Sequence, residues 1–237
     1  MTAFVMCKFF SVVSLLLQIH SYTCSRCEKT QLVPLADFDN LFVNEHVLWN
    51  DQMDSVAECI SRCFQDTRCR SVQVHGITSG CTGHATSFAS PTKIYPPATA
   101  LEGSRLFLLP RASHFIGSAC ASDGDCHVAT SVCNDGVCTC QIGYWFSASQ
   151  QACVTECSSL GLGLVRYDGH VIFGYDMTVH LMEETSCQHL CNGTCSSLDY
   201  DEKRSRCYIN NGTYLSVDVA SRGEEDKWVY YQRNCAQ

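Results

Sequence analysis

Residues 55–69 read SVAECISRCFQDTRC, and the spacing of cysteines in this segment sets the architecture of the chain. The first four residues have the S-x-x-E pattern of a helix N-terminus, in which Ser55 caps the free amide three residues on and Glu58 reaches back. Cys59 and Cys63 would then lie one helical turn apart on the same face. Two disulfides that leave this one face would attach the helix to a β-sheet.

The same cysteine spacing occurs a second time further along the chain. Four cysteines are matched 126 to 128 residues later: Cys59, Cys63, Cys69 and Cys81 by Cys187, Cys191, Cys195 and Cys207. In both sets the first pair is C-x3-C, and eleven residues separate the third cysteine from the fourth. An apolar–polar alternation typical of a half-buried strand follows the third cysteine of each set. An internal duplication explains these matches better than chance.

A shorter match extends the repeat toward the N-terminus. Residues 46–49 (HVLW) match residues 170–173 (HVIF), and Met53 matches Met177. We therefore expect the two segments to be equivalent strands. Because the histidine of each segment stands directly before an apolar strand, we expect it to have a structural role rather than a chemical one.

The N-terminus has the composition of a secretory signal peptide. Residues 1–18 carry one cation, Lys8, and are otherwise mainly apolar, and small residues follow at Ser21 and Thr23. The apolar run is shorter than the ~20 residues that cross a bilayer, so cleavage near residue 23 is expected rather than a membrane anchor. Cys7 would leave with this peptide and 18 cysteines would remain, a density typical of a disulfide scaffold in a secreted protein.

The formal net charge of −8 makes nucleic acid an unfavourable partner, because phosphate contact requires a basic face. One basic cluster, Lys203, Arg204 and Arg206, stands out against this acidic background. It could bind a sulfated sugar, but a solvated loop beside its acidic neighbours is the favoured interpretation.

Each copy of the repeat resembles a PAN/apple domain, and the resemblance covers residues 27–113 and 157–235. The ending of the second copy, WVYYQRNC at residues 228–235, is also similar to that of apple domains. The resemblance implies a small disulfide-rich α+β fold, in which one helix crosses an antiparallel sheet in each copy. It also implies four central disulfides and one outer disulfide: Cys59–Cys81, Cys63–Cys69, Cys187–Cys207, Cys191–Cys195 and Cys157–Cys235.

The first copy departs from the six-cysteine pattern of this family. Cys27 stands where Cys157 does, but the position that matches Cys235 falls near Ser113, where there is no cysteine. Cys27 therefore lacks its expected partner. It either bonds Cys24 across a tight C-x2-C, or one or both of these cysteines reach another chain.

A different cluster of six cysteines lies between the two copies. It resembles an EGF-like or EB module, for which six cysteines permit fifteen pairings. So short a segment can hardly bury a core, so its disulfides must supply the stability. The EGF pattern would join Cys120–Cys133, Cys126–Cys138 and Cys140–Cys153. Asp123 and Asp125 are interpreted as turn residues, and no calcium site is expected there.

The second copy carries surface features typical of an extracellular protein. Two N-x-T sequons predict glycans at Asn192 and Asn211. The aromatic residues Trp228, Tyr230 and Tyr231 are a candidate ligand surface, although alternate members of a strand should face the core. The basic residues of the 203–206 loop complete the set of candidate ligand contacts.

The sequence contains none of the motifs that we searched for as signs of catalysis. H-E-x-x-H and G-x-S-x-G are absent, and the nine histidines include no ligand pair at helical spacing. We therefore expect no catalytic residue, no cofactor and no metal site.

The sequence predicts four parts: a signal peptide (1–23), a PAN/apple domain (24–115), an EGF-like or EB module (116–154) and a second PAN/apple domain (155–237). The expected function is that of a secreted, non-catalytic binding or adhesion protein that engages extracellular proteins or carbohydrates. One alternative is a disulfide-cross-linked matrix or mucus component, with Cys24 or Cys27 joining chains. The other is a regulatory or inhibitory partner of an extracellular protease.

Overall fold

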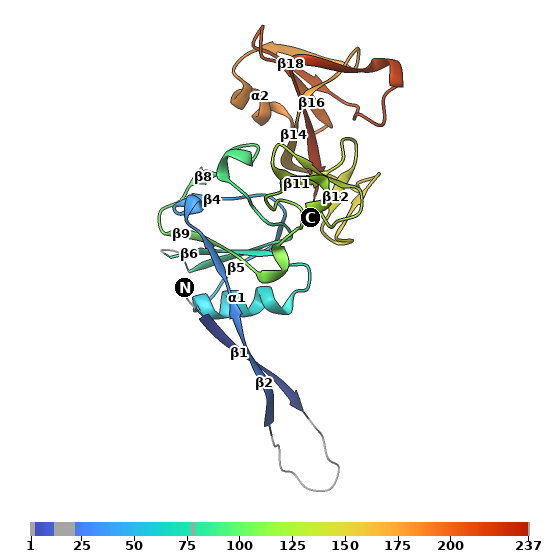
Figure 1. Cartoon of the computed structure of the whole chain (residues 1–237). Helices are drawn as coiled ribbons and strands as arrows, with labels where there is room; N and C mark the ends of the chain where they lie inside the picture. Colours follow the sequence, from blue (N-terminus) through green and yellow to red (C-terminus); the bar gives the residue numbers. More distant parts are fainter. Residues whose placement is uncertain (1–2, 12–21, 77–78, 237) are drawn as a thin grey trace.

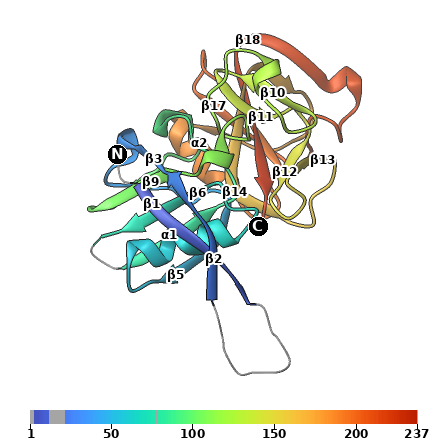
Figure 2. The same ribbon diagram turned by 60° about the horizontal axis from the view of Figure 1, so that its bottom comes forward.

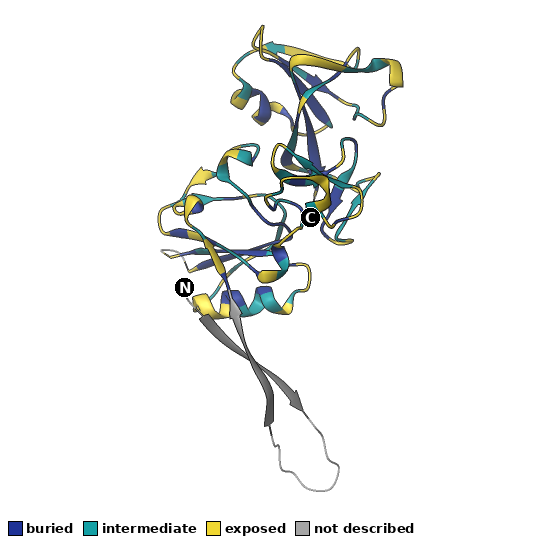
Figure 3. Cartoon of the chain, in the orientation of Figure 1, coloured by how far each residue is buried: buried dark blue, intermediate teal, exposed yellow. Residues whose placement is uncertain are grey.

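Two five-stranded antiparallel sheets lie toward opposite ends of the described chain, and two short hairpins pack beside their junction (Figure 1). The structure is a computed structural model. It describes the backbone of residues 3–11, 22–76 and 79–236, and the side chains of residues 32–76 and 79–236. Figure 3 shows buried segments in the strands of both sheets and exposed segments in the loops and in parts of the second sheet.

The first sheet carries one helix on its face. In spatial order its strands are β3 (Val33–Leu35), β9 (Ser104–Leu108), β6 (Ser71–His75), β7 (Gly80–His84) and β5 (Val47–Gln52). A small ladder of β4 (Leu41–Phe42) and β8 (Thr99–Ala100) flanks this sheet. Three single-turn 3-10 helices lie in its connections: η1 (Ala36–Phe38), η2 (Pro91–Lys93) and η3 (Pro110–Ala112).

The helix predicted from Ser55 onward is confirmed as α1 (Val56–Gln65). Ser55 Oγ accepts the N–H of Glu58, as in a standard capping box. The Glu58 carboxylate accepts the N–H of Asp54, one residue before the N-cap residue whose N–H it accepts in the standard box. Cys59 and Cys63 are buried on the face that meets the sheet. The structure joins them to Cys81 and Cys69, the two pairs that the resemblance implies.

The second sheet has the same strand arrangement as the first. In spatial order its strands are β14 (Leu160–Ile172), β18 (Arg222–Cys235), β16 (Ser197–Asp201), β17 (Arg206–Asn210) and β15 (Asp176–Leu181). The helix α2 (Glu184–Leu190) crosses it, and the single turn η5 (Val219–Ser221) precedes β18. Cys187 and Cys191 of this helix segment bond Cys207 and Cys195, and Cys157 bonds Cys235.

The prediction that residues 46–49 and 170–173 are equivalent strands is wrong. Asp51 of β5 pairs with Cys81, and His180 of β15 pairs with Cys207, so β15 rather than 170–173 occupies the place of β5. His170 instead lies on the opposite edge of its sheet, near the end of β14. The physical reason is the length of the first strand of each sheet, which is 13 residues for β14 and three for β3. The apolar residues 170–172, which resemble β5 in sequence, therefore form the end of β14.

The strand register also corrects the position in the first unit that corresponds to Cys235. Ser71 pairs with Leu108 in the first unit, and the equivalent Ser197 pairs with Gln232 in the second. Counting three residues on from each partner makes Arg111, and not Ser113, the residue equivalent to Cys235. The Arg111 guanidinium donates to four main-chain carbonyls around the end of α1, those of Cys63, Phe64, Asp66 and Cys69. A cation therefore ties the last segment of the first unit to its helix at the place where the second unit has a disulfide.

The central segment consists of two hairpins held by disulfides. Its elements are η4 (Asp123–Asp125), β10 (Ser131–Asn134), β11 (Val137–Cys140), β12 (Trp145–Ser147) and β13 (Ala152–Val154). Its three bonds are Cys120–Cys133, Cys126–Cys138 and Cys140–Cys153. Asp125 accepts the N–H groups of Ala121 and Ser122, and Asp123 accepts the N–H of Cys133, which is the expected behaviour of turn residues.

Loop residues of the first unit contact the second sheet directly. Tyr95 forms an isolated antiparallel bridge with Leu164, whose N–H donates to the Tyr95 carbonyl at 2.7 Å. The Tyr95 ring packs edge-on against Tyr231, and Asn234 Nδ2 lies 3.2 Å from His46 Nε2. The first unit is therefore attached to the β14–β18 part of the second sheet by both backbone and side-chain contacts.

The central segment packs on the same β14–β18 part. Tyr167 donates its hydroxyl hydrogen to the Cys140 carbonyl, at 2.9 Å. Gln232 bonds two main-chain groups of the central segment, accepting from Gly143 N–H and donating to the Tyr144 carbonyl. In the view of Figure 2 the hairpins again lie against these strands.

The N-terminal strands β1 (Ala3–Ser11) and β2 (Tyr22–Gln31) form an antiparallel pair that projects from the rest (Figures 1 and 2). Cys24 and Cys27 lie in β2, outside the residues whose side chains the structure describes, so their pairing stays a prediction. Within the described residues, the helices are too short or too polar to cross a membrane.

Candidate functional site

Five side chains form an exposed surface on the second sheet, which we call the aromatic face: Phe173, Val179, Leu181, Tyr208 and Trp228. The rings of Tyr208 and Trp228 lie 5.2 Å apart between centroids, and those of Phe173 and Trp228 lie 6.2 Å apart. Val179 pairs directly with Tyr208 across the β15–β17 ladder. Leu181 is 79% exposed and Val179 51% exposed, so this surface is accessible to a partner.

Strand alternation explains which residues reach this face. Trp228 and Tyr230 point to one side of β18, while Val229 and Tyr231 point to the other, where they join the core beneath α2. Trp228 is partly exposed because no other segment covers it fully.

The inclusion of Tyr230 in the candidate ligand surface is wrong. Tyr230 shares the side of Trp228 but has an exposed fraction of 0%, since Tyr167, Val217 and Tyr214 pack around its ring. Burial raises the pKa of its phenol, and the hydroxyl is engaged with Tyr214 N–H and Gln232. Tyr231, from the same aromatic run, is also fully buried. Of the aromatic residues selected from β18, Trp228 alone remains a surface residue.

The basic loop lies at one end of the aromatic face. Arg204 is paired with Asp201, whose carboxylate also accepts the N–H of Lys203, so this loop is held in place by a buried acid. Arg206 follows on β17, in register with both Leu181 and Asp201. Within the described residues neither Lys203 nor Arg206 forms an ion pair, so two exposed cations remain available beside the aromatic rings.

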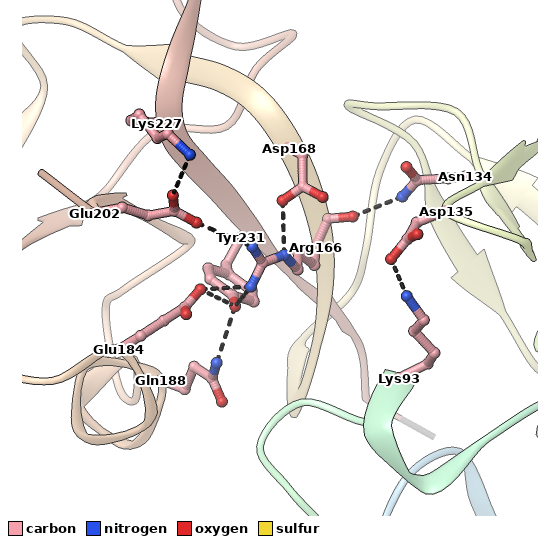
Figure 4. A network of polar contacts seen from close by, with 10 residues as sticks. All are labelled: Lys93, Asn134, Asp135, Arg166, Asp168, Glu184, Gln188, Glu202, Lys227 and Tyr231. Atoms are coloured by element: carbon pink, nitrogen blue, oxygen red, sulfur yellow. Dashed lines mark hydrogen bonds and ion pairs between the residues drawn. The ribbon is translucent and has the colours of Figure 1, made fainter.

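A polar network that the sequence reasoning missed lies on the other side of β18 (Figure 4). Arg166 of β14 contacts Asp168, Glu184 and Glu202, at 2.7, 2.6 and 3.5 Å. The Tyr231 hydroxyl donates to Glu184 and accepts from Arg166, at 2.6 and 3.0 Å. The network joins strands to α2, so its role in the structure is to hold the sheet and the helix together.

Further polar groups complete this network. Gln188 donates to the Tyr231 hydroxyl at 2.9 Å, and Lys227 lies 3.8 Å from Glu202 (Figure 4). Asn134 of the central segment donates to the Arg166 carbonyl, and Lys93 of the first unit pairs with Asp135. Apart from Asp168, the side chains that contact Arg166 come from distant segments, so the local sequence does not mark it.

An apolar groove of about 700 Å³ lies in the first unit between α1 and the β3–β9 edge. It is lined chiefly by Leu32, Pro34, Val56, Ile60, Val74 and Phe107. Asp39 and Arg105 supply its charged groups. The groove can accept an apolar side chain, but it presents no arrangement of nucleophile and base.

A cavity of about 80 Å³ at the three-way junction is lined by Glu45 and His46, two groups whose pKa values are shifted by burial. Burial raises the pKa of Glu45 to about 8, against main-chain hydrogen bonds that lower it. Burial and the neighbouring His84 lower the pKa of His46 to about 4, and burial lowers the pKa of His84 to about 4. His46 bonds Asn234, which agrees with the structural role expected of it, and His84 Nδ1 bonds the Glu45 carbonyl.

In the part of the chain that the structure describes, one group of side chains has the spacing of a metal site: Cys120, Cys126 and Cys138. All three are bonded to other cysteines, so they do not offer thiolates to a metal.

Both sequons lie at exposed positions of the second unit. Asn192 follows α2, and Asn211 follows the end of β17. Neither residue belongs to the aromatic face, so glycans at these positions would start outside that surface.

Comparison with known proteins gives a partial match. Residues 163–235 match the family model of the PAN domain. A solved structure of the two N-terminal apple domains of Toxoplasma gondii microneme protein 4 is 13% identical, covering 83% of this chain and 87% of that chain with a TM-score of 0.24. No curated protein matches. PAN and apple domains are known protein- and carbohydrate-binding modules and are typically non-catalytic.

Proposed function

We propose that this chain is a secreted, non-catalytic binding protein that engages extracellular proteins or carbohydrates through two PAN/apple units. The match of residues 163–235 to the PAN-domain family model supports one such unit. The shared strand order and the repeated cysteine pattern support a second unit over residues 24–115. The consecutive 1–3, 2–4 and 5–6 bonds of the central segment support an EGF-like module between them.

An extracellular location is part of this proposal. Eight disulfides lie within the described side chains, and such a number persists in oxidising compartments. The apolar N-terminal segment, proposed as a signal peptide, would direct the chain there. The sequons at Asn192 and Asn211 would be glycosylated on the same route.

The observation that carries the proposal is the exposed aromatic face of the second unit. Tyr208 and Trp228 are large rings held by packing, and Arg206 lies at their edge. Rigid aromatic residues and arginine are the side chains that most often dominate binding energy, because they bury much area at a small entropic cost. A ring face flanked by a cation suits a ligand with an apolar surface and polar or anionic groups.

Substitution of Trp228 tests this function. We expect Trp228→Ala to weaken binding to ligands found on a glycan array, or by pull-down from extracellular matrix, by about tenfold or more. Val219→Ala is the matched control, because Val219 is an exposed apolar residue on η5 and not on the aromatic face.

Equal loss of binding in both variants would contradict the assignment of the site. Full retention of binding by Trp228→Ala, with the disulfides intact by mass spectrometry, would move the ligand site elsewhere. The absence of any ligand in both screens would count against the binding function itself.

A further inference from the structure

The edge strand β15 of the second sheet exposes apolar side chains along its whole length. Met177, Val179 and Leu181 are all among the exposed large hydrophobic residues of the described chain. β15 pairs with β17 on one side, and the sheet ends there. An exposed, apolar edge strand is a template for pairing with another strand, and proteins normally cover or charge such edges.

The other edge of the same sheet is already covered. The outer side of β14 carries the bridge from Leu164 to Tyr95 of the first unit. Because β14 contacts another part of the same chain, β15 is the edge that is left for an external partner.

The corresponding strand of the first sheet is protected by its own side chains. Trp49 of β5 lies under the Arg62 guanidinium, 4.5 Å from its ring centroid, and Arg62 also pairs with Asp51. Leu48 packs against the core of the central segment. Thus β5 is charged and covered, whereas β15, its counterpart in the repeat, carries an uncovered apolar row.

The backbone of β15 is oriented for pairing on its free side. The N–H of Met182, directly after β15, donates to the carbonyl of Ser205, directly before β17, at 3.0 Å. Because the direction of main-chain groups alternates along an antiparallel strand, Val179 and Leu181 direct their N–H and C=O groups away from β17. These groups have the positions that a sixth strand would use.

We propose that β15 is the surface through which two copies of this chain associate, edge to edge and antiparallel, with Val179 opposite the partner's Val179. A two-fold axis through this residue would join the two five-stranded sheets into one continuous sheet. The proposal concerns association between copies and does not depend on the ligand-binding function.

Self-complementarity of the sequence supports a second copy as the occupant. In this register Met177 lies opposite the partner's Leu181, and Thr178 lies opposite the partner's His180. Asp176, the first residue of the strand, and Glu183, two residues beyond its end, face Met182 and Tyr175 of the other copy, so no like charges are opposed. Apolar cross-strand pairs of this kind stabilise a sheet, while opposed like charges destabilise it.

A neighbouring register is less favourable. An axis through His180 would place the partner's His180 opposite this histidine and would bring Asp176 opposite Glu184 of the other copy. That register places two acids opposite each other. It keeps Val179 opposite Leu181, but it places Met177 opposite the acidic Glu183. The sequence therefore selects the register centred on Val179.

Analytical ultracentrifugation of the secreted, oxidised chain tests the proposal. Only material that runs as a monomer in non-reducing denaturing electrophoresis is used, which removes any dimer linked through Cys24 or Cys27. We expect a concentration-dependent dimer that Val179→Lys weakens by about tenfold or more, because two lysines would then face each other. Val219→Lys is the control and should leave the dimer unchanged, since Val219 is exposed outside β15.

A charge-pair experiment makes the register itself testable. Val179→Glu alone should also weaken the dimer, and an equimolar mixture of Val179→Lys and Val179→Glu should restore it as a heterodimer. Restoration shows that both variants are folded and that position 179 faces itself. A wild-type chain that stays monomeric, a dimer that Val179→Lys leaves intact, or a mixture that fails to associate would each overturn the proposal.

Discussion

At the scale of single residues, the junction depends on acid and base groups held out of water. Glu45 has a carboxylate oxygen without a hydrogen-bond partner in the described structure, and a Cβ added at Gly163 would lie 3.0 Å from it. His46 and His84 are buried beside it in their neutral forms. Buried groups of this kind resist ionisation, because the charged form loses its hydration.

Stability should therefore pass through a maximum with pH. His46 and His84, with pKa values of about 4 against an ordinary 6.5, contribute stability that is lost as the pH falls from about 6.5 to 4, since the unfolded chain binds their protons first. Glu45, with a pKa of about 8 against 4.5, contributes stability that is lost as the pH rises from about 4.5 to 8. The unfolding midpoint in guanidinium should be highest near pH 6.5, where the gain from the two histidines equals the loss from Glu45.

Substitution of Glu45 by glutamine should remove the alkaline loss. Between pH 6 and 8.5, we expect the wild-type chain to lose about 2–3 kcal/mol more unfolding free energy than Glu45→Gln. Measurement of chemical unfolding at several pH values decides this. Parallel profiles for the two proteins would show that Glu45 titrates normally.

At the scale of elements, both units fix their last segment with an arginine, and the second unit adds a disulfide. Cys157–Cys235 links the segment before β14 to the end of β18, whereas Arg111 donates to carbonyls around α1 in the first unit. Arg233 of β18 makes the same kind of contacts, to the carbonyls of Cys195 and Gly161. The arginine clamp is thus common to both units, and the second adds a covalent bond to it.

Arg111→Gln should destabilise the first unit by about 2–3 kcal/mol, because several buried carbonyls would lose a charged donor. Arg105→Gln is the matched control, since Arg105 is an exposed residue of the neighbouring strand β9. Hydrogen exchange of the α1 amides reports the effect locally. Equal exchange in the two variants would show that the guanidinium is dispensable.

At the scale of the whole molecule, the three parts share one junction rather than forming separate beads. β14 and β18 receive contacts from the first unit through Tyr95 and from the central segment through Tyr144. Lys93 and Asp135 complete the ring of contacts between the first unit and the central segment. The angle between the two sheets is consequently fixed by packing.

Gly163→Val should disturb this arrangement without changing either unit. A Cβ at residue 163 would lie 3.0 Å from Glu45 and 3.3 Å from Asn234, and the branched side chain of valine adds further bulk. We expect a larger radius of gyration by small-angle X-ray scattering, with all disulfides retained. An unchanged scattering curve would show that the junction absorbs the side chain.

Much of the fold could be predicted from the sequence, and the candidate ligand surface only in part. The S-x-x-E signal at Ser55 predicted the helix, because this cap depends on two residues only three apart in the sequence. The resemblance to PAN/apple domains carried the pairing of Cys59 and Cys63. The equivalence of residues 46–49 and 170–173 was a wrong prediction, since apolar alternation does not specify which edge of a sheet a strand occupies.

The sequence by itself determined the spacing of the cysteines, the helix that presents them and the alternation of β18. Only the tertiary structure decided that Trp228 is exposed while Tyr230, on the same side of the strand, is covered by Tyr214. It also decided that Arg111 and Arg166 each bind several distant groups. The physical reason is that capping and alternation act between near neighbours, whereas burial depends on whichever remote segment packs against a given face.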